Sequence, residues 1–158
     1  MKLMCLNIWG GHVKEPLLNF ISQHKNIDFF CLQEVYHNAK EKISTDDKCV
    51  DLKIFSEIHA ILPNYKAFFR PIVNNIYGIG MFIHKDIDIL CEGEVVIHKN
   101  NDYIGCGPTH SRNLQWIECQ SNGQVYTILN IHGLWNGLGK NDSLERIAQS
   151  KKIKTFID

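Results

Sequence analysis

The sequence has 158 residues, 44% of them hydrophobic, which suits one globular domain spanning residues 1–158. Its 17 basic and 17 acidic residues give a formal net charge of zero, which argues against a protein that holds long nucleic acids through a net basic surface. The apolar runs are too short for a transmembrane segment, and the N-terminus lacks the small-residue cleavage site of a signal peptide.

The cysteines indicate the redox environment. Six are scattered along the chain without a C-x-x-C pair, and Cys5 and Cys31 fall in apolar, strand-like runs where a free thiol acts as a small hydrophobe. This pattern is typical of a reduced chain, so we expect a cytoplasmic protein. No feature indicates an obligate protein partner.

The first 34 residues predict a strand–helix–strand unit. Residues 2–8 form an apolar strand, Gly10 and Gly11 break it, and a helix runs from Pro16 to about His24. A second strand covers residues 28–34. Strands joined through a helix in this way are parallel neighbours, so their carboxyl ends lie at the same edge of the sheet.

The remainder predicts further strands and a closing helix. A mixed polar stretch ends in a helix at about residues 52–62. Five strands follow, at about residues 65–72, 77–84, 87–97, 112–119 and 124–132. Asn122-Gly123 between the last two predicts a hairpin. The closing helix begins near residue 143, where Asp142 and Glu145 have the spacing of a capping box.

One face of the closing helix is unusual. Arg146 and Gln149 share it with apolar residues that should pack inward, namely Ile153, Phe156 and Ile157. An inward arginine predicts either polar contacts into the sheet or a side chain whose stem covers apolar surface.

The candidate site lies at the strand ends. Asn7 and Glu34 end the two parallel strands, and His132 ends the last strand with Asn130 two residues before it on the same face. Taken singly, a Glu after a strand is usually a solvated loop residue and a lone His is usually structural. Together they place polar side chains at three strand ends, where ligands of α/β sheets gather.

The residue types favour magnesium. Mg²⁺ keeps most of its waters and needs one or two carboxylates beside a substrate phosphate, which Glu34 with Asn7 can supply. Mn²⁺ is the alternative ion. No His and Cys residues have the spacing of a zinc site.

Several segments resemble, in order, those of the endonuclease/exonuclease/phosphatase superfamily. They are LNIWGG (6–11), DFFCLQEV (28–35), YGIGMFIHK (77–85), SRNLQWIEC (111–119), LNIHG (129–133) and ERIAQS (145–150). The resemblance spans essentially the whole chain. It implies an α/β, DNase I-like four-layer α/β/β/α sandwich, and it implies hydrolysis of a phosphodiester by in-line attack of water, dependent on magnesium.

The resemblance also implies roles for individual residues. Glu34 matches the magnesium-binding glutamate, and Asn7 matches the asparagine that lines the metal site and supports catalysis. His132 is similar to the histidine that contacts the scissile phosphate, although Gly133 departs from the commoner leucine after it. Three other residues, assigned loosely to substrate binding, are Tyr77, Arg112 and Asn130.

Two segments of the superfamily are missing from the sequence. These are a GD-x-N segment with the aspartate that activates water and an S-D-H segment whose histidine contacts the phosphate. We therefore expect the C-terminal part of the domain to be absent from this chain. Expected substrates are nucleic acids, phospholipid head groups or inositol phosphates. The alternative function is a catalytically incomplete module that binds phosphorylated ligands or a protein.

Overall fold

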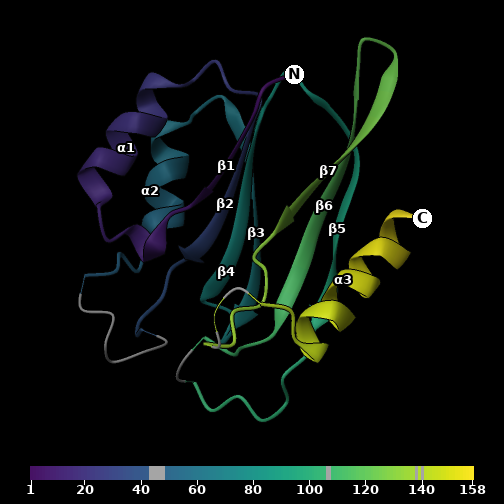
Figure 1. Cartoon of the computed structure of the whole chain (residues 1–158). Coiled ribbons are helices and arrows are strands. Elements are labelled where there is room, and N and C mark those ends of the chain that lie inside the picture. The colour runs from purple at the N-terminus through teal and green to yellow at the C-terminus, as the bar shows by residue number, and fades with distance from the viewer. Residues whose placement is uncertain (43–48, 106–107, 138, 140) are drawn as a thin grey trace.

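The computed structural model describes residues 1–42, 49–105, 108–137, 139 and 141–158. It is built in four layers, with two helices on one sheet, a second sheet facing it and a third helix on the outside (Figure 1). The helices are α1 (Lys14–Gln23), α2 (Ile54–Ile61) and α3 (Leu144–Ile157), and a short 3-10 turn covers Trp9–Gly11. The strands are β1 (Leu3–Asn7), β2 (Phe29–Tyr36), β3 (Tyr65–Val73), β4 (Tyr77–His84), β5 (Asp88–His98), β6 (Arg112–Ser121) and β7 (Gln124–Ile131).

The first sheet has the strand order β1-β2-β4-β3, and β1 and β2 pair in parallel as the sequence predicts. The second sheet has the order β5-β6-β7 and is antiparallel. The predicted hairpin joins β6 to β7, with Asn122 and Gly123 at φ values of 52° and 75°. Two consecutive residues with positive φ suit the twist of a two-residue hairpin loop.

Alternating side chains of β2 and β4 serve two separate cores. Phe30, Leu32 and Phe82 point towards α1 and α2. Phe29, Cys31, Met81 and Ile83 point towards the second sheet, where they meet Ile117 and Cys119 of β6. The two-residue period of a strand explains how one apolar run is buried on both faces.

The main contacts of the second sheet fall on β2, β3 and β4. Strand β7 packs over β2 and β4, and β6 packs over β3. Leu3 and Asn7 of β1 are therefore exposed, whereas their partners in the register, Phe29 and Gln33, are buried. Since Asn7 lies on this open side, the carboxyl end of β1 is accessible.

Helix α3 begins one residue later than the predicted capping box requires. Ser143, not Asp142, is the N-cap, and its Oγ accepts a hydrogen bond from Arg146 N at 3.3 Å. The capping-box prediction is wrong because a hydroxyl immediately before the helix satisfies this amide. Gln149 is buried as predicted, and half-buried Arg146 donates to Asn141 O at 2.7 Å rather than into the sheet.

No helix in the described part of the chain is long and apolar enough to cross a membrane.

Candidate active site

Glu34 occupies a β-bulge. The β2–β4 register pairs Gln33 with Ile79 and Val35 with Gly78, so Glu34 has no partner on β4. Its φ is 59°, in the left-handed region, which costs a residue with a Cβ about 1–2 kcal/mol. The bulge breaks the alternation of the strand and leaves Glu34 half-buried between buried neighbours. An apolar strand thereby delivers a carboxylate to the sheet edge.

Asn7 supports this carboxylate from the end of β1. Its Nδ2 donates to Glu34 Oε1 at 2.9 Å, and its Oδ1 accepts from Trp9 N at 2.9 Å. The amide of Trp9 can only donate, so it sets the orientation of the Asn7 side chain and directs Nδ2 to Glu34. Asn7 therefore orients the Glu34 carboxylate.

His132 follows β7 and faces the same carboxylate. Its Nε2 lies 3.5 Å from Glu34 Oε1. Burial, and secondly the charge of Arg112, lowers the pKa of His132 to about 4. The imidazole is therefore neutral at pH 7, so this contact is not an ion pair. Asn7, Glu34 and His132, which the sequence places at three strand ends, lie together.

Arg112 is committed to the main chain beneath the site. Its side chain is buried and donates to Gly133 O at 3.2 Å, Pro108 O at 2.8 Å and His110 O at 2.7 Å, and also to Ser111 O at 3.1 Å. Burial lowers its pKa to about 10. Arg112 thus ties residues 108–111 to the segment after β7 that carries His132.

Asn130 lies at the centre of a buried polar seam between the sheets. Its Oδ1 accepts from Gln33 Nε2 at 2.7 Å. Its Nδ2 lies 3.2 Å from Leu32 O, 3.1 Å from Gly80 O and 3.3 Å from Gln115 Oε1. Gln115 continues the seam by donating to Phe68 O at 3.0 Å. Such satisfied networks hold elements in one register.

Aromatic residues form the wall beside His132, and two of them were missed by the sequence reasoning. Tyr77, from the predicted substrate-binding set, is buried with its ring centroid 5.5 Å from that of His110. His110 is in turn 6.4 Å from His132 and 5.7 Å from Tyr103. His110 and Tyr103 lie in the β5–β6 connection, which lacks a periodic pattern. The only sequence feature that pointed to this segment was the nearby Arg112.

The donor set fits a hard divalent cation. Glu34 is an oriented carboxylate beside an amide, at an open sheet edge. Nowhere in the described residues do three His, Cys, Asp or Glu side chains gather into a metal-binding group. One oriented carboxylate beside an amide suits Mg²⁺, which keeps several waters and takes few protein ligands.

Comparisons with known proteins show the fold. No protein-family model matches the sequence, and the comparison with curated proteins gave no significant match. Solved structures do match. An endonuclease/exonuclease/phosphatase from Bacteroides vulgatus has a TM-score of 0.64 at 20% identity, over 98% of this chain and 58% of its own.

Two other solved structures also match. TDP2 of D. rerio, complexed with a single-strand DNA product, has a TM-score of 0.70 at 16% identity, over 98% of this chain and 53% of its own. A mannosyl-6-phosphatase of Bacteroides thetaiotaomicron has a TM-score of 0.64 at 16% identity, over 94% of this chain and 51% of its own. The predicted DNase I-like sandwich is therefore confirmed, and this chain spans just over half the length of these three.

Proposed function

We propose that this chain carries the metal-binding edge of a magnesium-dependent phosphoester hydrolase. The observation that carries the proposal is Glu34, which is held on a bulge at a φ of 59° and oriented by Asn7 through a 2.9 Å hydrogen bond. Backbone strain of this kind persists where the surroundings over-determine it, and it gathers at functional sites. A carboxylate needed only for solubility would not require it.

Each of the three residues has a distinct task. Glu34 would hold the cation, with Mn²⁺ able to replace Mg²⁺, and Asn7 keeps the carboxylate turned to the edge. When bound, the cation supplies Lewis-acid polarisation of a phosphoryl oxygen. His132 is neutral at pH 7, and a neutral imidazole carries one N–H group. This N–H would donate a hydrogen bond to the phosphoryl group and stabilise the charge that develops there.

The other predicted site residues support the site without contacting the substrate. Arg112 is 2% exposed and its guanidinium binds main-chain carbonyls, so we assign it to holding the His132 segment and not to a substrate contact. Asn130 is 1% exposed and holds the two sheets in register beneath the site. Tyr77 forms the wall beside His132.

The structural neighbours support a phosphoester as the ligand class. One is a mannosyl-6-phosphatase, and another is complexed with a single-strand DNA product. Nucleic acids, phospholipid head groups and inositol phosphates are the substrates that follow from the resemblance. The cytoplasmic location stays a prediction, based on the free thiols.

A phosphate-binding module without catalysis is the second candidate. Among the carboxylates of the described residues, only Glu34 contacts Asn7 or His132. In-line attack needs a base for the water, and Glu34 is already assigned to the cation. A chain that binds metal and phosphate but cleaves nothing would therefore have this second function.

Paramagnetic NMR with Mn²⁺ tests the assignment. We expect Mn²⁺ to broaden the Asn7 side-chain amide and His132 ring resonances in the wild-type chain and in Glu15→Gln, an exposed-residue control on α1. Glu34→Gln should abolish the broadening. Broadening that persists in Glu34→Gln, or that centres elsewhere, would refute the site. Hydrolysis of bis(p-nitrophenyl) phosphate with Mg²⁺ then separates an enzyme from a binding module.

A further inference from the structure

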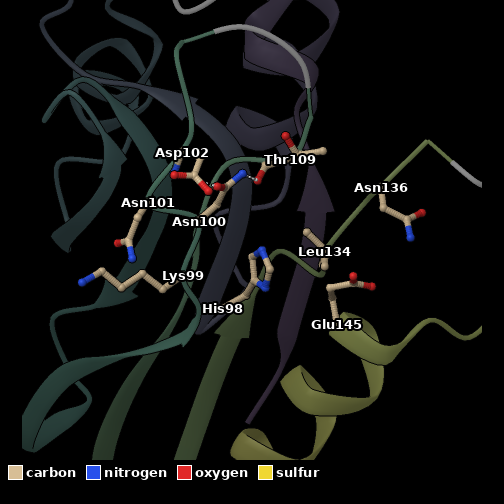
Figure 2. Close-up of a pocket in the computed structure, with 9 residues that line it drawn as sticks. All are labelled: His98, Lys99, Asn100, Asn101, Asp102, Thr109, Leu134, Asn136 and Glu145. Atoms are coloured by element: carbon tan, nitrogen blue, oxygen red, sulfur yellow. Dashed lines mark hydrogen bonds between the residues drawn. The ribbon is translucent and has the colours of Figure 1, made fainter.

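A polar cleft of about 440 Å³ opens between the β5–β6 connection and the start of α3 (Figure 2). Its lining residues are His98, Lys99, Asn100, Asn101, Asp102, Thr109, Leu134, Asn136 and Glu145. His98 lies in the middle, with the residues of the connection on one side and Leu134 and Glu145 on the other. The cleft is separate from the cluster of Asn7, Glu34 and His132.

One wall of the cleft is preorganised. Asn100 Oδ1 accepts from Asp102 N at 3.0 Å, and Asn100 Nδ2 donates to Thr109 O at 2.9 Å (Figure 2). Its backbone amide donates to Ser111 Oγ at 2.9 Å. These bonds join the two ends of the connection, so the polar groups that face the cleft are held before any ligand arrives.

The lining is suited to hydroxyl groups. Asn101 supplies an amide that both donates and accepts, while Asp102 and Glu145 supply acceptors. Burial lowers the pKa of His98, whose neutral ring offers one donor and one acceptor. The ammonium group of Lys99 offsets only one of the two carboxylates, so the charge of the lining does not favour a phosphate inside the cleft. A neutral polyhydroxylated group can satisfy this mixture of donors and acceptors.

The cleft shares a wall with the catalytic edge. Thr109 and Leu134 line the cleft, and the chain passes directly from them to His110 and, through Gly133, to His132. Arg112 binds the carbonyls of His110 and Gly133, and so fixes both segments of this wall together.

Gly133 adds no side chain to this wall. It is exposed, and a Cβ added there would meet only Gln149 Oε1, at 3.9 Å. Its φ is not in the left-handed region, so the glycine is not required by the backbone. No side chain therefore stands between His132 and Leu134, which lines the cleft, along this segment.

We propose that the cleft binds the polyhydroxylated alcohol portion of a phosphoester, a sugar or a cyclitol, while its phosphate lies across Gly133 at Glu34 and His132. This inference rests on the proposed function, because the phosphate is placed by that site. It narrows the substrate class to polyol phosphates.

Isothermal titration calorimetry with Mg²⁺ present provides the test. The probes are inorganic phosphate, myo-inositol 1-phosphate, glucose 6-phosphate and thymidine 5′-phosphate. We expect one of the two polyol phosphates to bind the wild-type chain about tenfold more tightly than inorganic phosphate, the gain from a few hydrogen bonds to hydroxyl groups. The tighter of the two identifies a cyclitol or a pyranose.

Single-residue variants test whether the tighter binding of the polyol phosphate comes from the cleft. Asn101→Ala and Glu145→Gln should reduce the preference for the polyol phosphate to about twofold or less without changing the affinity for inorganic phosphate. Asn19→Ala, an exposed control on α1, should change neither affinity.

The outcomes separate the two proposals. If inorganic phosphate does not bind the wild-type chain, the proposed function and this inference both fail. If inorganic phosphate binds but neither polyol phosphate is preferred, only the inference fails. It also fails if thymidine 5′-phosphate is preferred to both, or if the preference survives both cleft variants.

Discussion

Replacing Glu34 by two small residues separates its backbone strain from its carboxylate. Glu34→Ala and Glu34→Gly both remove the hydrogen bond from Asn7 and the contact with His132. Alanine keeps the cost of a φ of 59°, about 1–2 kcal/mol, whereas glycine does not. Glycine loses about 0.5–1 kcal/mol more than alanine through backbone entropy on folding. The net expectation is that Glu34→Gly is more stable than Glu34→Ala by about 0.5–1 kcal/mol.

Urea unfolding followed by circular dichroism measures this difference. For a chain of this length it corresponds to a melting temperature about 1–4 °C higher for the glycine variant. Lys66, an exposed residue on β3 with ordinary backbone geometry, is the matched control, and there glycine should be the less stable replacement by about 0.5–1 kcal/mol. If glycine is no more stable than alanine at position 34, the strain argument is wrong.

Three further perturbations test the framework of the site. Asn130→Leu should lower the free energy of unfolding by about 3 kcal/mol, because the buried amides of Gln33 and Gln115 lose their partner. Replacing both glutamines by leucine as well should recover most of the loss. A loss below about 1 kcal/mol in Asn130→Leu alone would argue against the seam. Gly78→Ala should lower the free energy of unfolding by more than about 2 kcal/mol, since a Cβ would lie 2.0 Å from Arg70 O. Gly123→Ala should lower it by about 1 kcal/mol, from the positive φ alone. Equal losses measured by urea unfolding would contradict the steric account. Burial raises the pKa of Cys31 from 9.0 to about 12, so its contribution to stability is complete below pH 9 and is lost by about 1.4 kcal/mol per pH unit between pH 9 and 12. Unfolding measured at pH 8 and 10 should show that part of the pH dependence disappear in Cys31→Val, and an unchanged dependence would refute the assignment.

The sequence predicted the strand frame of the site well. The βαβ pattern required β1 and β2 to be parallel, and that alone brings Asn7 near Glu34. The boundaries of the remaining strands differ from the predicted ones by at most two residues. Local alternation and turn residues determine such features, so they can be read without knowing the tertiary structure.

The bulge at Glu34 could not be predicted in this way. Strict alternation places Glu34 on the same face as Leu32, among side chains packed against the helices. The actual direction depends on the register with β4, where Val35 pairs with Gly78 and Glu34 is skipped. That register is set by contacts between segments more than forty residues apart in the chain.

The polar seam and the aromatic wall beside His132 could not be predicted from the sequence either. Gln115 and Asn130 stand in strands that read as ordinary alternating runs, and only the packing of the sheets shows that their amides meet. His110 lies in a connection of polar and small residues. Its position beside His132 follows from the carbonyl contacts of Arg112, which no sequence pattern records.

A crystal structure of the chain grown with Mn²⁺, with anomalous data collected at the manganese edge, tests the central claim most directly. The account predicts an anomalous peak within bonding distance of a Glu34 carboxylate oxygen, about 2.1–2.2 Å for a small divalent ion, in the wild-type chain and none there in Glu34→Gln. A peak bound by other residues, or a wild-type crystal saturated with Mn²⁺ and empty at Glu34, would contradict it.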